Sequence, residues 1–567
     1  MSVRIRLISI FIIAVSLFLS VRLYFVQIVH GETFAADAER QHINKNTILY
    51  DRGTIYFRSQ NGDEPPAAIS RSGFTIAINP QALGNPEEIY NKLSEIIVLD
   101  KKDFLVKAAK KNDVYEEITT HLNEEASEKI KALNLYGVSI STDKWRFYPA
   151  SSLAAQTIGF VAYKGDALAG RYGLERYYEE VLKKDPNSAY NNFFAEFFIN
   201  VKESLSEFPK ESGDIFTSIE PSLQLFLENE LKAVRAKWQS DGAGGVVIDP
   251  NTGEIFAIGW NPSFDPNDFH GENVEAFQNQ IVEGVYEMGS IIKPLTMAAG
   301  LDSGLIAATS TYFDQGYLVL NNKRISNYDG RGRGVATMQD VLNQSLNTGA
   351  AYVALKLGNQ KFSEYMKNYG VGTETGIDLP NEAVGLTKNL DSSREIEIAT
   401  ASYGQGIAMT PIATVRALSA LANGGKLIVP HVVKKIEYDT GLSKRISFAP
   451  GKQVISPAAS DEITRMLVNV VDTSLAGGTA KIPGFSVAAK TGTAQMTDEG
   501  VAGYAEGKFL HSFFGYFPAY NSRFLVFLFH IYPKNVRYAS ETLTEPFLNI
   551  TKFLINYYQI PPDRPEN

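Results

Sequence analysis

The sequence contains no cysteine among its 567 residues. This absence excludes disulfides, thiolate metal sites and a cysteine nucleophile. A basic excess is also missing, because 54 lysine and arginine residues stand against 63 aspartate and glutamate residues, for a net charge of −9. No basic stripe interrupts this balance, which argues against nucleic acid as a partner.

Two further kinds of catalytic site have no support in the sequence. There is no Gly-x-Ser-x-Gly elbow of the kind that carries the nucleophile of α/β-hydrolases. The seven histidines are scattered, and no pair has the spacing of zinc ligands. We therefore predict no metal site and no cofactor, and we interpret His431 and His511 as packing or surface residues.

Long apolar runs are scarce, and a single one could cross a membrane. The 23 residues from Leu7 to Val29 contain one charge, Arg22, and as a helix would span about 34 Å. Arg4 and Arg6 precede the run, which predicts a cytoplasmic N-terminus and an extracytoplasmic remainder. A cleaved signal peptide is the alternative, but the small-x-small site Ala36-Asp37-Ala38 comes only after polar residues. We predict an uncleaved single-pass anchor.

A chain of this length is expected to form several domains. Turn and composition signals predict a tail and anchor at 1–30, a non-catalytic mixed α/β pedestal at 31–212, a second large domain at 213–563 and a short tail at 564–567. In the large domain, strand patterns occur at Gly244 to Ile248, Glu254 to Ile258, Ser486 to Ala489, Ser512 to Phe517 and Phe524 to Ile531. The first two precede a long helical interval, and the last three follow it. The turn from Asp249 to Gly253 predicts a hairpin between the first two of these strands. The overall order predicts an α+β fold, an antiparallel sheet covered by helices.

The stretch from Tyr286 to Pro294 holds the candidate nucleophile. If a helix begins at Gly289, Ser290 lies at its N-terminus and Lys293 lies one turn later on the same face. A serine hydroxyl needs an adjacent base, and a neutral lysine amine can serve as one. The same spacing recurs from Ser141 to Lys144, so this motif alone does not identify the nucleophile.

Two more motifs follow in the same domain. Ser345-Leu346-Asn347 comes after a short helical run that opens at Thr337, and Lys490-Thr491-Gly492-Thr493 comes after the predicted strand at Ser486 to Ala489. The Ser-x-Asn pattern also occurs at Ser59-Gln60-Asn61, whereas Lys-Thr-Gly occurs once. The motifs are 55 and 145 residues apart, and this order and spacing give the set its specificity.

With these three motifs the chain resembles the class B penicillin-binding proteins, membrane-anchored D,D-transpeptidases of peptidoglycan synthesis. Similar landmarks extend over nearly the whole length: Val21 to Tyr24, Asp51 to Gly53, Arg146 to Pro149, Gly173 to Glu175, Asp249 to Glu254, Gly404 to Gly406, Asn423 to Gly425 and Gly477 to Ala480. Three departures are Asn46-Thr47 in place of Arg-Gly, Met288 in place of Pro and Ala489 in place of Gly. None of them removes a reactive group.

The resemblance implies that Ser290 attacks the penultimate D-Ala carbonyl of a stem peptide, with Lys293 as the base. An ordinary lysine pKa of about 10.4 must fall by about 3 units for this role, which burial and a second lysine can supply. The other implied roles are a proton relay through Ser345 and Lys490, an amide contact from Asn347, substrate binding by Thr491, Gly492 and Thr493, and an oxyanion hole from the backbone N–H groups of Ser290 and Thr493.

Other functions share parts of this pattern. A D,D-carboxypeptidase, a β-lactamase or β-lactam sensor, and a catalytically idle cell-wall scaffold would carry the same motifs. For a β-lactamase, Glu364 and Asn368 resemble a deacylation motif only superficially and fit better on a helix surface. From Gly484 to Thr491 the chain also approximates a phosphate-binding loop, but Ala489 stands where that loop needs glycine.

The resemblance also implies partners and location. We expect peptidoglycan stem peptides and β-lactam antibiotics as ligands, and a polytopic membrane glycan polymerase with other cell-wall assembly proteins as partners. The expected place is the bacterial cytoplasmic membrane. The segment from Asn261 to Asn267 favours the division-type branch over the elongation-type branch.

Overall fold

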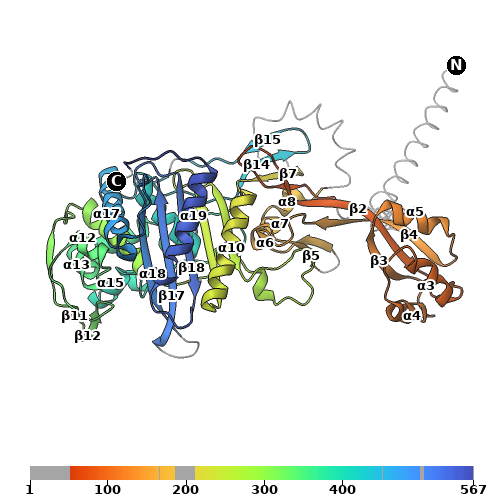
Figure 1. Ribbon diagram of the computed structural model, residues 1–567, viewed down its shortest axis with the longest axis horizontal. Helices are drawn as coiled ribbons and strands as arrows, with labels where there is room; N and C mark the ends of the chain where they lie inside the picture. Colours follow the sequence, from red (N-terminus) through yellow and green to blue (C-terminus); the bar gives the residue numbers. More distant parts are fainter. Residues whose placement is uncertain (1–50, 165–166, 185–210, 450, 498–502, 566–567) are drawn as a thin grey trace, which may run out of the picture. The chain divides into compact units, whose positions relative to one another are not determined.

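The computed structural model describes residues 51–164, 167–184, 211–449, 451–497 and 503–565 (Figure 1). The predicted anchor from Leu7 to Val29 lies outside these residues. Within them, no helix combines the length and the apolar character needed to cross a membrane. The described chain forms two compact units, a smaller one built mainly from Ser70–Arg146 and a larger one that contains the three motifs.

The smaller unit is a small mixed α/β fold. Its strands are the end of β2 (Pro66–Ile78), β3 (Glu116–Leu122) and β4 (Val138–Phe147), and its helices are α3 (Pro86–Ser94), α4 (Lys101–Ala108) and α5 (Glu124–Ala132). β2 pairs with both other strands, and the helices bury Leu93, Phe104 and Ile130 in a common core. Ser141 and Lys144 lie on strand β4, so the second Ser-x-x-Lys match has no helical geometry.

The larger unit contains a five-stranded antiparallel sheet in the order β16-β17-β18-β8-β9. The strands are β8 (Gly242–Ile248), β9 (Ile255–Asn261), β16 (Ala488–Thr497), β17 (Tyr504–Phe517) and β18 (Phe524–Ile531). This confirms the predicted antiparallel sheet and the β8–β9 hairpin. The strand predicted from Ser486 begins two residues later, at Ala488, and runs on through the Lys490 motif to Thr497.

Both faces of this sheet are covered, which explains why β18 is apolar at almost every position. Phe524 and Val526 pack into one core cluster, while Leu525 and Phe527 pack into the other. Alternate side chains point to opposite faces, so an unbroken apolar run is expected for a strand that is buried on both sides. The cluster that contains Phe524 and Val526 also includes residues of α10 (Pro221–Trp238) and α19 (Thr544–Tyr557), which contact each other beside the sheet (Figure 1).

The opposite face carries the helical layer that the sequence placed between the strands. α11 (Lys293–Asp302) is surrounded by other helices and is buried from Lys293 to Gly300. The remaining helices of this layer are α12 (Met338–Asn343), α13 (Asn347–Leu357), α14 (Asn359–Asn368), α15 (Glu395–Ala401), α16 (Pro411–Ala422) and α17 (Pro457–Thr473). Thr337 caps α12 in a reciprocal capping box with Asp340, which confirms the predicted helix start.

Two landmarks from the first half of the sequence meet inside the larger unit. Arg52 forms a buried ion pair with Glu175, at 2.8 Å between Nη2 and Oε2, and a second one with Glu179. Glu175 lies on α7 (Gly173–Tyr177) and is fully buried. A buried carboxylate needs a paired cation, so these motifs have a structural reason to occur together.

Candidate active site

Ser290 lies in a tight helical turn that two glycines make possible. Gly289–Ile292 form a 3-10 turn that continues as α11, which confirms the predicted helix start at Gly289. Gly289 has φ +66°, and a Cβ there would stand 2.8 Å from the carbonyl oxygen of Thr493. Gly404 is similarly restricted, since its Cβ would lie 2.2 Å from Gly289 O. Ser290 is thereby held between strand β16 and the Gly404 turn.

Strand β16 packs directly against this turn. A Cβ at Gly492 would lie 2.7 Å from Met288 O, and Ser512 Oγ donates a hydrogen bond of 2.8 Å to the same oxygen. The Met288 side chain is itself buried. The glycine of the third motif therefore allows the nucleophile turn to approach the strand.

The Lys293 amine is buried and surrounded by the second motif. Nζ donates to Ser345 O at 2.5 Å and to Asn347 Oδ1 at 2.7 Å, and lies 3.2 Å from Ser345 Oγ. The first two oxygens can only accept, whereas a hydroxyl can also donate. A neutral amine, with two N–H groups and one lone pair, satisfies all three contacts if Ser345 donates to it.

The Ser345 hydroxyl lies between two lysines. Lys490 Nζ donates to Ser345 Oγ at 3.1 Å and to Thr491 O at 3.0 Å. Ser345 has φ +53°, a left-handed conformation that non-glycine residues rarely adopt and that is often associated with functional sites. Asn347 is also held, because its Nδ2 donates to Ser326 O at 2.9 Å.

Burial sets the charges of both lysines. Desolvation, reinforced by the charge of Lys490, holds the pKa of Lys293 well below its ordinary value. Burial also lowers the pKa of Lys490, to about 8. The shift favours the neutral form of Lys293, which is suited to accept a proton, beside a Lys490 that is largely charged near pH 7.

The side chains of Thr491 and Thr493 make no hydrogen bond to either lysine amine among the described residues, although the Thr491 carbonyl accepts from Lys490. Thr491 and Thr493 alternate with Lys490 and Gly492 along β16, so the two threonines share one face of the strand. β16 is an edge strand among the described residues and can accept an extended peptide beside it. No hydrogen bond joins Ser290 to Lys293 in the described chain; such bonds often form only when substrate is bound.

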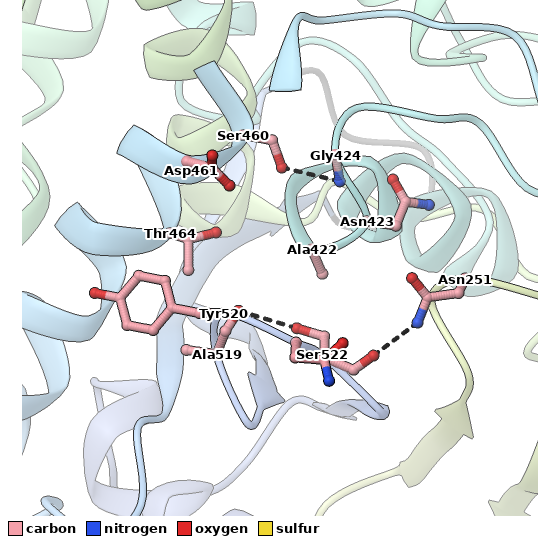
Figure 2. A pocket seen from close by; sticks show the side chains of 11 residues that line it. Asn251, Ala422, Asn423, Gly424, Ser460, Asp461, Thr464, Ala519, Tyr520 and Ser522 are labelled. Atoms are coloured by element: carbon pink, nitrogen blue, oxygen red, sulfur yellow. Dashed lines mark hydrogen bonds between the residues drawn. The ribbon is translucent and has the colours of Figure 1, made fainter. Parts of the chain in front are cut away.

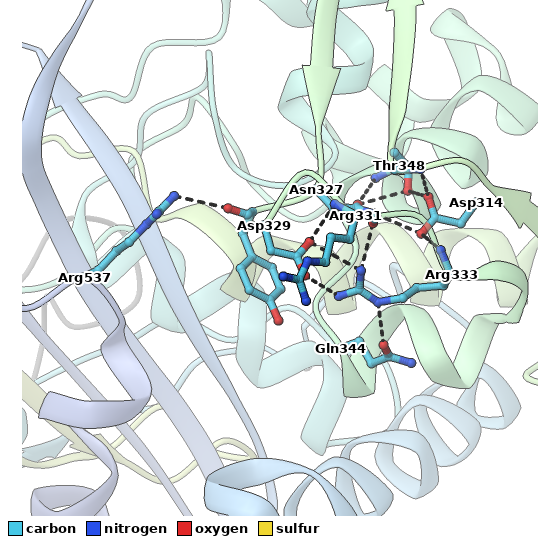
Figure 3. A network of polar contacts seen from close by, with 10 residues as sticks. Asp314, Asn327, Asp329, Arg331, Arg333, Gln344, Thr348 and Arg537 are labelled. Atoms are coloured by element: carbon cyan, nitrogen blue, oxygen red, sulfur yellow. Dashed lines mark hydrogen bonds and ion pairs between the residues drawn. The ribbon is translucent and has the colours of Figure 1, made fainter.

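Sequence reasoning missed a buried carboxylate behind the second motif. Asp314 accepts hydrogen bonds from Thr348 Oγ1 at 2.8 Å and Asn327 Nδ2 at 2.9 Å (Figure 3). It also accepts from the backbone N–H groups of Gly316 and Arg333. Thr348 directly follows the motif residue Asn347, but Asp314 lies more than 30 residues away in a short strand, and no local pattern points to it.

We predict that Asp314→Ala destabilises the catalytic unit and slows acylation by penicillin. Four donors lose their acceptor, which should lower the free energy of unfolding in urea by about 3 kcal/mol. Asp329→Ala is the matched control, because it removes an exposed ion pair with Arg333 in the same network, at a cost below about 1 kcal/mol. Equal stability of the two variants would contradict the role assigned to Asp314.

The structure disfavours two alternatives from the sequence. The stretch from Gly484 to Thr491 ends in an extended strand paired with β17, whereas a phosphate-binding loop leads into a helix. Glu364 is exposed on α14 and accepts a hydrogen bond from Gln360. It therefore lies on a helix surface, as expected.

A polar hollow of about 150 Å³ lies elsewhere in the larger unit (Figure 2). It is lined by Asn251 of the β8–β9 turn, Asn423 after α16, Asp461 and Thr464 of α17, and Tyr520 of the β17–β18 turn. None of the predicted catalytic residues lines it. The hollow is therefore separate from the residues that gather around Ser345.

Known proteins share both parts of this architecture. Residues 243–552 match the penicillin-binding protein transpeptidase domain, and residues 47–197 match the penicillin-binding protein dimerisation domain. Stage V sporulation protein D of Bacillus subtilis is 30% identical over 563 residues, covering 96% of this chain and 84% of that protein. Peptidoglycan D,D-transpeptidase FtsI of Buchnera aphidicola is 27% identical, covering 97% and 94%.

Solved structures agree on the fold. Penicillin-binding protein 2X from Streptococcus thermophilus superimposes with a TM-score of 0.73 at 20% identity, covering 91% of this chain and 80% of that one. At this identity the likeness concerns the fold alone.

Proposed function

Because this chain belongs to the class B penicillin-binding proteins, we propose that Ser290 is the nucleophile with which it cross-links peptidoglycan. The protein is a serine-type D,D-transpeptidase that acts on stem peptides and is acylated by β-lactams. The observation that best supports the site is the Ser345 hydroxyl held between the amines of Lys293 and Lys490, beside the Ser290 turn.

Acylation begins when the Ser290 hydroxyl attacks the carbonyl carbon of the penultimate D-Ala. The neutral Lys293 amine takes the hydroxyl proton, and the backbone N–H groups of Ser290 and Thr493 bind the oxyanion. The C–N bond then breaks, and the leaving D-Ala amine receives a proton through Ser345 and Lys490. The result is an ester on Ser290 and a free D-Ala.

The second half of the reaction reverses these proton movements. The amine of a second stem peptide attacks the ester carbonyl, the new C–N bond forms, the ester C–O bond breaks, and the proton returns to the Ser290 oxygen. In the first half, before the terminal D-Ala leaves, Thr491 and Thr493 bind its carboxylate and Asn347 holds the amide of the donor. An extended donor peptide gains backbone hydrogen bonds along the free edge of β16.

The full-length protein should form cross-linked dimers from purified donor and acceptor stem peptides. Mass spectrometry of the products separates transfer to an amine from transfer to water. A cross-linked product together with a long-lived penicilloyl adduct supports the transpeptidase. Free tetrapeptide alone would indicate a D,D-carboxypeptidase, rapid release of the adduct would indicate a β-lactamase, and no adduct would indicate a scaffold.

We place this activity outside the cytoplasmic membrane, on the anchor predicted from Leu7 to Val29. The proposed division of the chain keeps a non-catalytic pedestal at 31–212 and a transpeptidase domain at 213–563. A polytopic glycan polymerase is the proposed membrane partner, and the segment from Asn261 to Asn267 favours a role in division. Accumulation of a fluorescent fusion along the side wall would argue against that last point.

A further inference from the structure

Two histidines face each other in the sheet that carries the third motif. His511 on β17 pairs in register with His530 on β18, and both side chains are fully buried. Burial lowers the pKa of His511 to about 4 and that of His530 to about 3, so both rings are neutral near pH 7. A neutral imidazole carries one N–H donor and one acceptor nitrogen.

A chain of hydrogen bonds passes through both rings. His511 Nε2 lies 3.0 Å from Arg537 O, and its Nδ1 lies 3.0 Å from Thr542 Oγ1. Thr542 Oγ1 is 2.9 Å from His530 Nε2. At the far end, His530 Nδ1 lies 2.7 Å from Ser240 Oγ. Ser240 and Thr542 are buried as well.

The Arg537 carbonyl at one end determines which group donates and which accepts in each hydrogen bond of this network. Arg537 O can only accept, so His511 donates from Nε2, and its Nδ1 accepts from the Thr542 hydroxyl at 3.0 Å. The same hydroxyl also points toward Ala539 O at 3.3 Å. Thr542 then accepts from His530 Nε2–H. His530 Nδ1 consequently accepts from the Ser240 hydroxyl. Every ring nitrogen and both hydroxyls have a partner, and each ring is held in a single tautomer.

This network of hydrogen bonds includes two residues, Arg537 and Thr542, of a segment that contacts the third motif. Thr542 closes helix α18 (Ala539–Thr542), and the backbone N–H of Ala539 donates to Thr493 Oγ1 at 3.1 Å. That bond occupies one lone pair of the Thr493 hydroxyl and leaves its proton for another acceptor. Thr493 also pairs in register with His511, so the two side chains lie on the same face of the sheet.

We propose that the chain from Ser240 through His530, Thr542 and His511 is a positioning device for Thr493. It holds α18 so that Ala539 orients the Thr493 hydroxyl with its proton directed toward the carboxylate of the donor peptide or β-lactam. The inference rests on the proposed role of Thr493 in binding that carboxylate. It assigns no catalytic role to the histidines, which touch neither substrate nor nucleophile.

Substitutions at Thr542 test this arrangement with little change in shape. Thr542→Val removes the hydroxyl and should lower the second-order rate constant of acylation by labelled penicillin about tenfold. Thr542→Ser keeps the hydroxyl and should restore the rate to near wild type. Tyr516→Phe is the matched control, because it removes a buried hydrogen bond to Thr464 from the same strand, β17, and should leave acylation unchanged.

A double-mutant cycle and a second acylating probe test whether the effect of Thr542→Val on acylation acts through Thr493. Thr542→Val should slow acylation no further in a Thr493→Val background, and it should slow a penicillin methyl ester, which lacks the carboxylate, much less than penicillin. Multiplicative effects, or equal slowing of both probes, would overturn the proposal. If Thr542→Val does not fold, the pair His511→Leu and His511→Gln decides by the same criteria.

Failure of the proposed function would be seen separately. In that case the Ser290→Ala protein would still be labelled, or Thr493→Val would acylate as fast as wild type. The cycle at Thr542 is interpreted against those two measurements.

Discussion

Ser290→Ala is expected to abolish acylation of the full-length protein by labelled penicillin, a loss of at least about ten-thousand-fold. The Ser290 Oγ atom forms the ester bond, and alanine removes it. The Lys293 amine is buried and committed to Ser345 and Asn347, so it is not positioned to attack. The measurement is fluorescence of the labelled protein after gel separation.

The fold of this variant should be intact, because alanine at the start of a helical turn is well tolerated. Circular dichroism and the thermal unfolding midpoint provide the check. Ser141→Ala is the matched control: Ser141 belongs to the other Ser-x-x-Lys match but lies on strand β4, and its replacement should leave labelling unchanged. Persistent labelling of a folded Ser290→Ala protein would refute the assignment of the nucleophile.

Lys490→Ala should both slow acylation and move its pH profile. Acylation requires a neutral Lys293, so the wild-type rate should rise with pH through the lowered pKa of Lys293. It also requires a charged Lys490, so the rate should fall again above about pH 8. Removing the charge of Lys490 removes a repulsion that disfavours protonation of Lys293, and the pKa of Lys293 must therefore rise.

The acid limb of the variant is consequently expected to lie at higher pH than in wild type, and the basic limb should disappear. At pH 7 the combined loss of the proton relay and of neutral Lys293 should reach about a hundredfold. The rate constant of acylation between pH 5 and pH 10 is the measurement. An acid limb at the wild-type position would show that the two lysines do not interact.

Much of the catalytic unit could be predicted from local patterns. The apolar runs of β8 and β18 indicated strands, the turn between β8 and β9 indicated a hairpin, and Thr337 with Asp340 indicated a helix start. These signals are local and depend on residues within one or two turns. The exact bounds of β16 could not be predicted, because Lys490, Thr491 and Gly492 lower the apolar character of a strand that packing and pairing with β17 extend to Thr497.

The contacts that organise the site are long-range and could not be predicted in the same way. Order and spacing brought Ser290, Ser345 and Lys490 together as a set, and the structure places Ser345 between the two lysine amines. Asp314 carried no motif. His511 was interpreted as a packing or surface residue, and only the fold shows that it is fully buried and bonded to Thr542. A polar residue on an apolar strand gives no indication of its partner.

Peptide mapping of the penicilloyl adduct tests the central claim most directly. The full-length protein is treated with penicillin, digested, and sequenced by tandem mass spectrometry. The adduct should fall on the peptide that contains Ser290, with fragment ions that place the added mass on that serine. An adduct on Ser345, on Ser141 or on any other residue would contradict the account.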